Sequence, residues 1–154
     1  MFLKAALKTN DMKRGFTIVE IMVVVGIIMI LVVIAAPGIM RSRIVGNEAA
    51  AVANLRTLNN ACQMYHINIE AYPDSLQDMA EPQANPPYLD PVLATGRKQG
   101  YEFIYSLLDA DRFTVNANPT TSGLLKGRYF FMNETGVIRS NPTQPAGPDD
   151  EIVK

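Results

Sequence analysis

The sequence contains one cysteine, one histidine and no tryptophan. A single cysteine, Cys62, cannot form a disulfide within the chain. His66 has no second histidine or neighbouring cysteine with which to build a metal or catalytic cluster, so we interpret it as structural. The formal net charge of −1 gives no electrostatic case for nucleic-acid binding. We also find no nucleophile with its base and no phosphate-binding loop, and therefore expect a non-enzymatic protein without cofactor or metal.

What the sequence does have is a long apolar run from Phe16 to Ala36, in which Glu20 is the only charged residue. At about 1.5 Å of rise per residue, a helix of this length crosses a hydrocarbon core of roughly 30 Å. We therefore predict a transmembrane helix over residues 16–37. A carboxylate inside such a helix is costly to insert, so Glu20 should have a partner, and no lysine or arginine within this helix can supply one.

The start of this run resembles a known signal. The residues Lys13-Arg14-Gly15-Phe16-Thr17-Ile18-Val19-Glu20, followed by the apolar run and Pro37, are similar to the class III signal of type IV pilins and of type II secretion pseudopilins. The resemblance covers about the first third of the chain. It implies that a prepilin peptidase cuts between Gly15 and Phe16 and methylates the new N-terminus of Phe16. We expect Glu20 to pair with the Phe16 amine of a neighbouring subunit, which would set the register of assembly.

Residues 1–15 are interpreted as a leader that is removed. They carry four basic residues and one acidic residue, so the mature chain has a net charge of about −4. The basic residues hold the leader on the cytoplasmic side of the membrane. Because the cut precedes the apolar run, the anchor stays attached, and the rest of the chain should be extracytoplasmic. Translation from Met1 or from Met12 would serve equally well.

The transmembrane segment should be followed by a second, amphipathic stretch of helix over residues 38–72. Pro37 and Gly38 predict a kink between the two parts. Apolar residues then recur at steps of three and four, and should face a sheet: Ile44, Ala51, Leu55, Leu58, Cys62, Tyr65 and Ile69. Cys62 on this stripe is interpreted as a small buried group. The helix should end before Tyr72-Pro73.

Beyond the helix we expect a connecting loop over residues 73–100, with one short helix near its start, and then an antiparallel sheet over residues 101–140. Alternating apolar residues place four strands in the sheet: Tyr101–Leu108, Arg112–Ala117, Arg128–Met132 and Val137–Ser140. A turn at Asn133–Gly136 joins the last two. Residues 141–154 should be a flexible tail. The predicted fold class is α+β and pilin-like, with a long kinked helix packed on a small sheet of about four strands.

The acidic run Asp149-Asp150-Glu151 is interpreted as a solvated tail rather than as a calcium loop. Two departures from the family bear on function. Many type IV pilins close a C-terminal loop with a disulfide, which one cysteine cannot form. The pseudopilin signature Asp-Pro-Trp-Gly is also absent, since there is no tryptophan.

The function that we predict is that of a structural subunit of a type IV pilus or related filament, assembled from the inner membrane. The alternative within the family is the major pseudopilin of type II secretion. A membrane-anchored, extracytoplasmic ligand-binding domain is the alternative of another class. The expected partners are the prepilin peptidase, other copies of the chain in a helical filament, an inner-membrane assembly platform and membrane lipids.

Overall fold

The computed structural model describes residues 15–81, 83–120 and 126–153. Its internal contacts divide the chain into two units, Met1–Gly38 and Ile39–Lys154, and each is described by itself. One helix, α1 (Ile18–Ile69), begins in the first unit and continues into the second.

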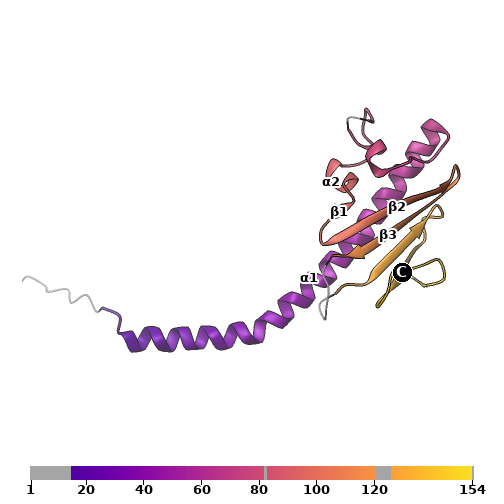
Figure 1. The fold of residues 1–154 in the computed structure, drawn as a ribbon. Helices are drawn as coiled ribbons and strands as arrows, with labels where there is room; N and C mark the ends of the chain where they lie inside the picture. The colour runs from indigo at the N-terminus through magenta and orange to yellow at the C-terminus, as the bar shows by residue number, and fades with distance from the viewer. Residues whose placement is uncertain (1–14, 82, 121–125, 154) are drawn as a thin grey trace, which may run out of the picture. The chain divides into compact units, whose positions relative to one another are not determined.

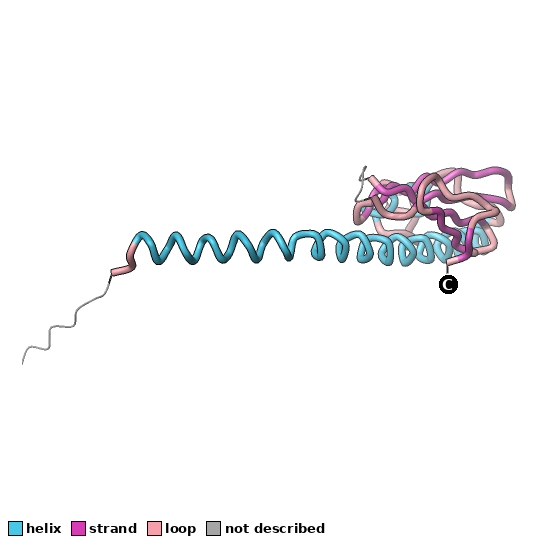
Figure 2. The backbone as a smooth tube through the Cα atoms, turned by 90° about the horizontal axis from the view of Figure 1, so that it is seen from below, coloured by secondary structure: helices cyan, strands magenta, loops and turns pink. Residues whose placement is uncertain are grey.

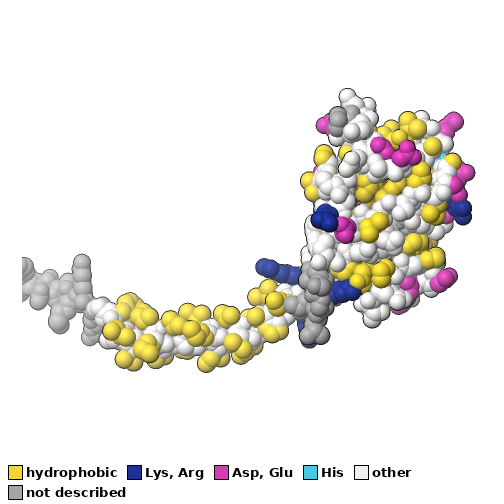
Figure 3. All heavy atoms as spheres, in the orientation of Figure 1, with side chains coloured by type: hydrophobic (Ala, Val, Ile, Leu, Met, Phe, Trp, Pro, Cys, Tyr) yellow, Lys and Arg dark blue, Asp and Glu magenta, His cyan; other side chains and the backbone are white. Residues whose placement is uncertain are grey.

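In the first unit, the described part of α1 has no polar face. Every residue from Gly15 to Gly38 is exposed, and apolar side chains cover the visible surface of this segment (Figure 3). A helix that is apolar on all sides is stable only in a protein interior or in a membrane. Among the described helices, α1 alone is long and apolar enough to cross a membrane. The helix predicted over residues 16–37 is present from Ile18 onward, and its passage through a membrane stays a prediction.

In the second unit, α1 is amphipathic. Its buried side chains recur along one stripe: Ala51, Leu55, Leu58, Ala61 and Cys62. The predicted stripe is confirmed at these central positions, whereas Ile44 and Tyr65 are only partly buried. Ile69 was wrongly included, because it is 56% exposed. Ile69 is the last residue of the helix, and the next residue, Glu70, takes a left-handed conformation with φ 60°. The apolar periodicity thus runs one turn beyond the part of the helix that the sheet covers.

The segment between helix and sheet contains more structure than predicted. The short helix expected near its start is the 3₁₀ helix η1 (Leu76–Met79), where Asp78 Oδ2 accepts hydrogen bonds from Ser75 N at 2.7 Å and Ser75 Oγ at 2.9 Å. Two further elements were missed, the helix α2 (Pro91–Ala94) and the strand β1 (Arg97–Lys98). Elements of two to four residues are too short to produce a recognisable period.

The sheet has six antiparallel strands, paired in chain order, rather than about four. After β1 come β2 (Tyr101–Asp109), β3 (Arg112–Pro119), β4 (Tyr129–Asn133), β5 (Ile138–Asn141) and β6 (Glu151–Ile152). The four strands predicted from alternation are β2 to β5, and they lie side by side (Figure 1). The turn predicted between the last two is confirmed, with Gly136 at φ 74°.

One face of this sheet packs on the second part of α1. The helix forms one layer and the strands form the other (Figure 2). The strand residues that fill the space between the two layers alternate along β2, β3 and β4, and each is at most 3% exposed: Tyr101, Phe103, Phe113, Val115, Ala117, Phe130 and Met132. The α+β class and the helix-on-sheet architecture are therefore as predicted.

The C-terminal residues, expected to be a flexible tail, contain β6, which pairs with β5. Val153 N donates to Ile138 O at 2.9 Å, beyond the end of that pairing. Ala146 is buried, and so is Phe131, which alternates with the core-facing Phe130 and Met132 and therefore lies on the other face of the sheet. This small buried group outside the main core indicates that the chain folds back over the sheet. A two-residue strand after several prolines gives little sequence signal.

Candidate functional site

The candidate site is the start of α1, where the predicted cleavage position meets the apolar run. Residues 15–17 are not helical, and α1 begins at Ile18. Thr17 Oγ1 accepts a hydrogen bond from Glu20 N at 3.2 Å, which is the bond of a helix N-cap. Thr17 and Glu20 have the spacing of a capping box, in which a glutamate three residues after the cap supports the first turn. This spacing is visible in the sequence, but the resemblance to prepilins assigns Glu20 only to assembly.

Glu20 consequently lies in the first turn of α1, where the unsatisfied backbone N–H groups carry partial positive charge. That position partly offsets the cost of placing a carboxylate at the edge of an apolar environment. It leaves the charge itself unpaired by any side chain, because within residues 15–38 Glu20 is the only charged residue that the structure describes. The four residues Gly15, Phe16, Thr17 and Glu20 line one shallow surface hollow.

Gly15 has no local structural reason to be glycine. A Cβ built on it would meet nothing within 4 Å, and its φ is not in the left-handed region. Phe16, the next residue, is 77% exposed. Both sides of the predicted cleavage bond are therefore accessible, on backbone that precedes the helix. The predicted cleavage, methylation and assembly residues are neighbours in the sequence, and their roles stay predictions.

The predicted kink residues, Pro37 and Gly38, lie inside α1, and the helix is assigned without interruption through both. Proline has no N–H, so one backbone hydrogen bond is missing at this point. A Cβ on Gly38 would meet nothing within 4 Å. These two residues end the first unit, and the kink stays a prediction.

Cys62 and His66, the other two residues singled out in the sequence, both pack against side chains of the fold. Cys62 is fully buried in the core, and burial raises the pKa of its thiol to about 12. The prediction that it is a buried structural group is confirmed. The His66 ring packs on Tyr72 with centroids 4.5 Å apart, and its Nε2 lies 3.8 Å from Asp111 Oδ1. Neither residue joins a group of three potential metal ligands among the described residues.

The acidic run near the C-terminus contains one carboxylate with a structural role. Asp149 and Glu151 are exposed, whereas the Asp150 carboxylate closes the preceding loop. Asp150 Oδ2 accepts from Gly147 N at 2.8 Å, and Asp150 Oδ1 accepts from Asn141 Nδ2 at 2.9 Å. These bonds, the first above all, hold the pKa of Asp150 below its ordinary value. Sequence reasoning missed this role for Asp150, because the bond to Asn141 depends on how the loop folds back.

Comparison with protein families decides the identity of the N-terminal segment. Residues 10–36 match the family described as the prokaryotic N-terminal methylation motif. This motif supports the resemblance of the N-terminal segment to those of type IV pilins and pseudopilins. The match spans the predicted cleavage bond, Glu20 and the whole apolar run, which supports the general interpretation of a pilin-like filament subunit.

Three curated proteins similar to the chain carry the same name, type II secretion system core protein G. The protein of Escherichia coli (strain K12) is 35% identical over 95 residues, which are 62% of this chain and 65% of that protein. The protein of Aeromonas hydrophila is 32% identical over 58% of this chain and 62% of its own length. The protein of Pectobacterium carotovorum subsp. carotovorum is 33% identical over 44% of this chain and 43% of its own length.

The matched segments thus span less than two thirds of each relative's own length. No solved structure matches the chain.

Proposed function

We propose that the chain is a major pseudopilin, a structural subunit of the filament of a type II secretion system. The observation that carries this proposal is the methylation motif on a helix that is apolar on every side and exposed at every residue from Ile18 to Gly38 in the single chain. Such a helix needs a membrane before assembly and other copies of itself afterwards. The sequence alone favoured a type IV pilus, whereas the names of the three relatives favour the secretion filament instead.

The proposed maturation begins with a prepilin peptidase on the cytoplasmic side of the inner membrane. It cuts between Gly15 and Phe16 and methylates Phe16, while residues 16–37 remain in the bilayer. The absence of any steric or conformational demand at Gly15 supports this step, since a requirement for glycine there would come from the enzyme that approaches the backbone. The sheet domain then lies outside the cytoplasmic membrane, and an inner-membrane assembly platform moves the subunit into the filament.

Glu20 is proposed to align neighbouring subunits. Cleavage creates a cation at the Phe16 amine, and a neighbour shifted along the filament axis would offer its amine at the depth of this carboxylate. A buried ion pair of this kind adds little net stability, but leaving one partner alone costs about 3–5 kcal/mol, so the pair selects one register among otherwise similar apolar contacts. The helix start suggests a competing role, because Glu20 also occupies the third position after the cap Thr17.

Two substitutions separate these roles. Glu20→Gln keeps a side chain that can serve in a capping box but removes the charge, whereas Glu20→Val removes both. If charge sets the register, both variants should be cleaved at Gly15 yet should accumulate in the membrane and give few filaments, and Glu20→Asp should assemble in part. If capping is the role, Glu20→Gln should assemble like the unchanged chain.

The experiment expresses each variant with the peptidase and with either a type II secretion platform or a type IV pilus platform. Sheared surface filaments are separated from membranes, and the chain is quantified in each fraction by immunoblot. Filaments with the secretion platform and none with the pilus platform are expected. The reverse pattern would reject the secretion assignment, and normal filament yield from Glu20→Val would reject the register mechanism.

A further inference from the structure

We propose that the sheet domain binds the head group of an anionic phospholipid at the end where α1 enters it. The inference rests on the proposed membrane anchoring. The site is a hollow of about 210 Å³, here called the basal hollow. Its walls come from α1 and from the adjacent ends of the sheet, and include Met40, Arg43, Ile44, Asn47, Tyr101 and Pro119.

The position of the basal hollow along the chain matches the level of lipid head groups. Arg41 and Arg43 follow Ala36, the end of the apolar run, by five and seven residues of continuous helix. These separations correspond to at most about 8 and 11 Å along the helix. The head-group layer on each side of a bilayer is roughly 5–8 Å thick, and long arginine side chains reach back toward it. Both cations are therefore available to lipid phosphates.

The charge at this end of the domain also favours the binding of an anionic head group. Arg41 and Arg43 are exposed, and neither has an ion-pair partner among the residues that the structure describes. Glu48, one turn beyond Ile44, does not compete, because its carboxylate accepts from Arg128 N at 2.9 Å and from Arg128 Nε at 3.1 Å. Figure 3 shows basic side chains at the end of the sheet domain where the helix enters it.

The size and lining of the basal hollow favour a lipid over a free anion. At about 30 Å³ per water molecule, 210 Å³ accommodates a glycerol phosphate group, but it is smaller than an ordinary pocket for a drug-sized ligand. Arg43 and Asn47 provide donors for a phosphate. Met40, Ile44 and Pro119 provide an apolar wall against which the first carbons of an acyl chain can lie. A phospholipid presents both of these chemistries.

The test uses the mature full-length chain in detergent, where filament assembly is not required. Short-chain phosphatidylglycerol, short-chain phosphatidylcholine and soluble glycerol phosphate are each titrated, and bound molecules are counted by native mass spectrometry. Phosphatidylglycerol should bind more tightly than the other two. Arg43→Gln should weaken its binding about fivefold, the equivalent of the roughly 1 kcal/mol that one basic residue gains at an anionic surface, and Arg43→Lys should restore most of the loss.

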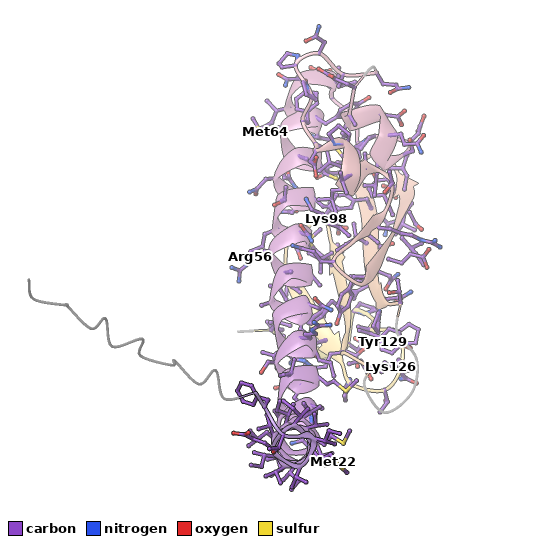
Figure 4. All side chains as sticks on the ribbon, turned by 90° about the vertical axis from the view of Figure 1, so that its left-hand side faces the viewer. Met22, Arg56, Met64, Lys98, Lys126 and Tyr129 are labelled. Carbon is purple, nitrogen blue, oxygen red and sulfur yellow. The ribbon has the colours of Figure 1, made fainter. Side chains whose placement is uncertain are left out.

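Arg56→Gln is the matched control. Arg56 is also an exposed arginine of α1, but it lies about 20 Å further along the helix than Arg43 and points away from the sheet (Figure 4). Equal affinity for the two lipids, an equal effect of Arg56→Gln, or equally tight binding of glycerol phosphate would overturn the proposal. So would an Arg43→Gln chain that keeps its lipid affinity but loses filaments, because the basal hollow would then be a contact between subunits. Filament yield of the same variants reports on the proposed function separately.

Discussion

Cys62 allows the packing of α1 on the sheet to be tested quantitatively, because it is the only thiol in the chain. Its side chain is 0% exposed, and burial raises its pKa from the ordinary 9.0 to about 12. Only a thiolate reacts readily with thiol reagents. At neutral pH the buried group therefore holds about a thousandfold less thiolate than an exposed cysteine would. Labelling of the folded chain must accordingly proceed through opening of the interface between helix and sheet.

The expected labelling rates follow from how rarely the domain opens. A domain with a typical stability of 5–15 kcal/mol opens globally in fewer than about one molecule in a thousand. We expect Cys62 in the folded chain to react at least about a thousandfold more slowly than in urea-unfolded chain at the same pH. The raised pKa also makes stability depend on pH. The neutral thiol contributes fully below pH 9, and this contribution is lost as the pH rises from about 9 to about 12.

Substitution at the same position gives an independent measure. Cys62→Ala removes one buried heavy atom and should cost about 1 kcal/mol. Cys62→Ser places an unpaired hydroxyl in the core and should cost about 1–3 kcal/mol. Met64→Ala is the control, since Met64 is 58% exposed, points away from the sheet (Figure 4), and should change stability by less than about 0.5 kcal/mol. Unfolding is followed by tyrosine fluorescence in urea. Labelling of the folded chain within tenfold of the unfolded rate, or disulfide-linked dimers on a non-reducing gel, would refute the packing described here.

Two further predictions concern the ends of the fold. Pro37→Ala restores a backbone donor inside α1, so it should give stiffer or poorly packed filaments while cleavage at Gly15 stays intact. Filaments of unchanged yield and flexibility in electron micrographs would show that the kink is incidental. Asp150→Ala should expose the loop after Asn141 to proteases, because it removes two hydrogen bonds from that loop, and Asp149→Ala is the control. Since the pKa of Asp150 is lowered on folding, its contribution is present above the ordinary carboxyl pKa and lost as pH falls, so acid should reproduce the effect of Asp150→Ala. Resistance of Asp150→Ala to proteolysis would contradict the closure of this loop by the carboxylate.

Those parts of the fold that repeat a pattern over many residues could be predicted from the sequence. The apolar run, the central stripe from Ala51 to Cys62 and the alternation along β2 to β5 each contain several turns or several pairs of residues. The parts that depend on a few contacts between distant residues could not. β1 and β6 are two residues long, and only their pairing with β2 and β5 defines them.

The functional residues, like the fold, include some that could be predicted from the sequence and others that could not. Gly15, Phe16 and Glu20 are contiguous enough to form a motif, and the family match covers all three. The capping spacing from Thr17 to Glu20 is equally local, but the resemblance to prepilins points to assembly and not to capping. The basal hollow joins α1 to Tyr101 and Pro119 across the fold. No local pattern indicates that these segments meet, because the contact depends on how the strands pair and pack against the helix.

The position at which the mature chain begins is the most direct test of a processed, membrane-anchored filament subunit. The chain is expressed with the peptidase, sheared filaments are collected, and the mass of the subunit is measured intact and after proteolysis. We predict an N-terminus at Phe16 that carries one additional methyl group, on a chain that retains the whole apolar run. Filament subunits that keep Gly15 and the residues before it, or that begin beyond Ala36, would contradict this claim.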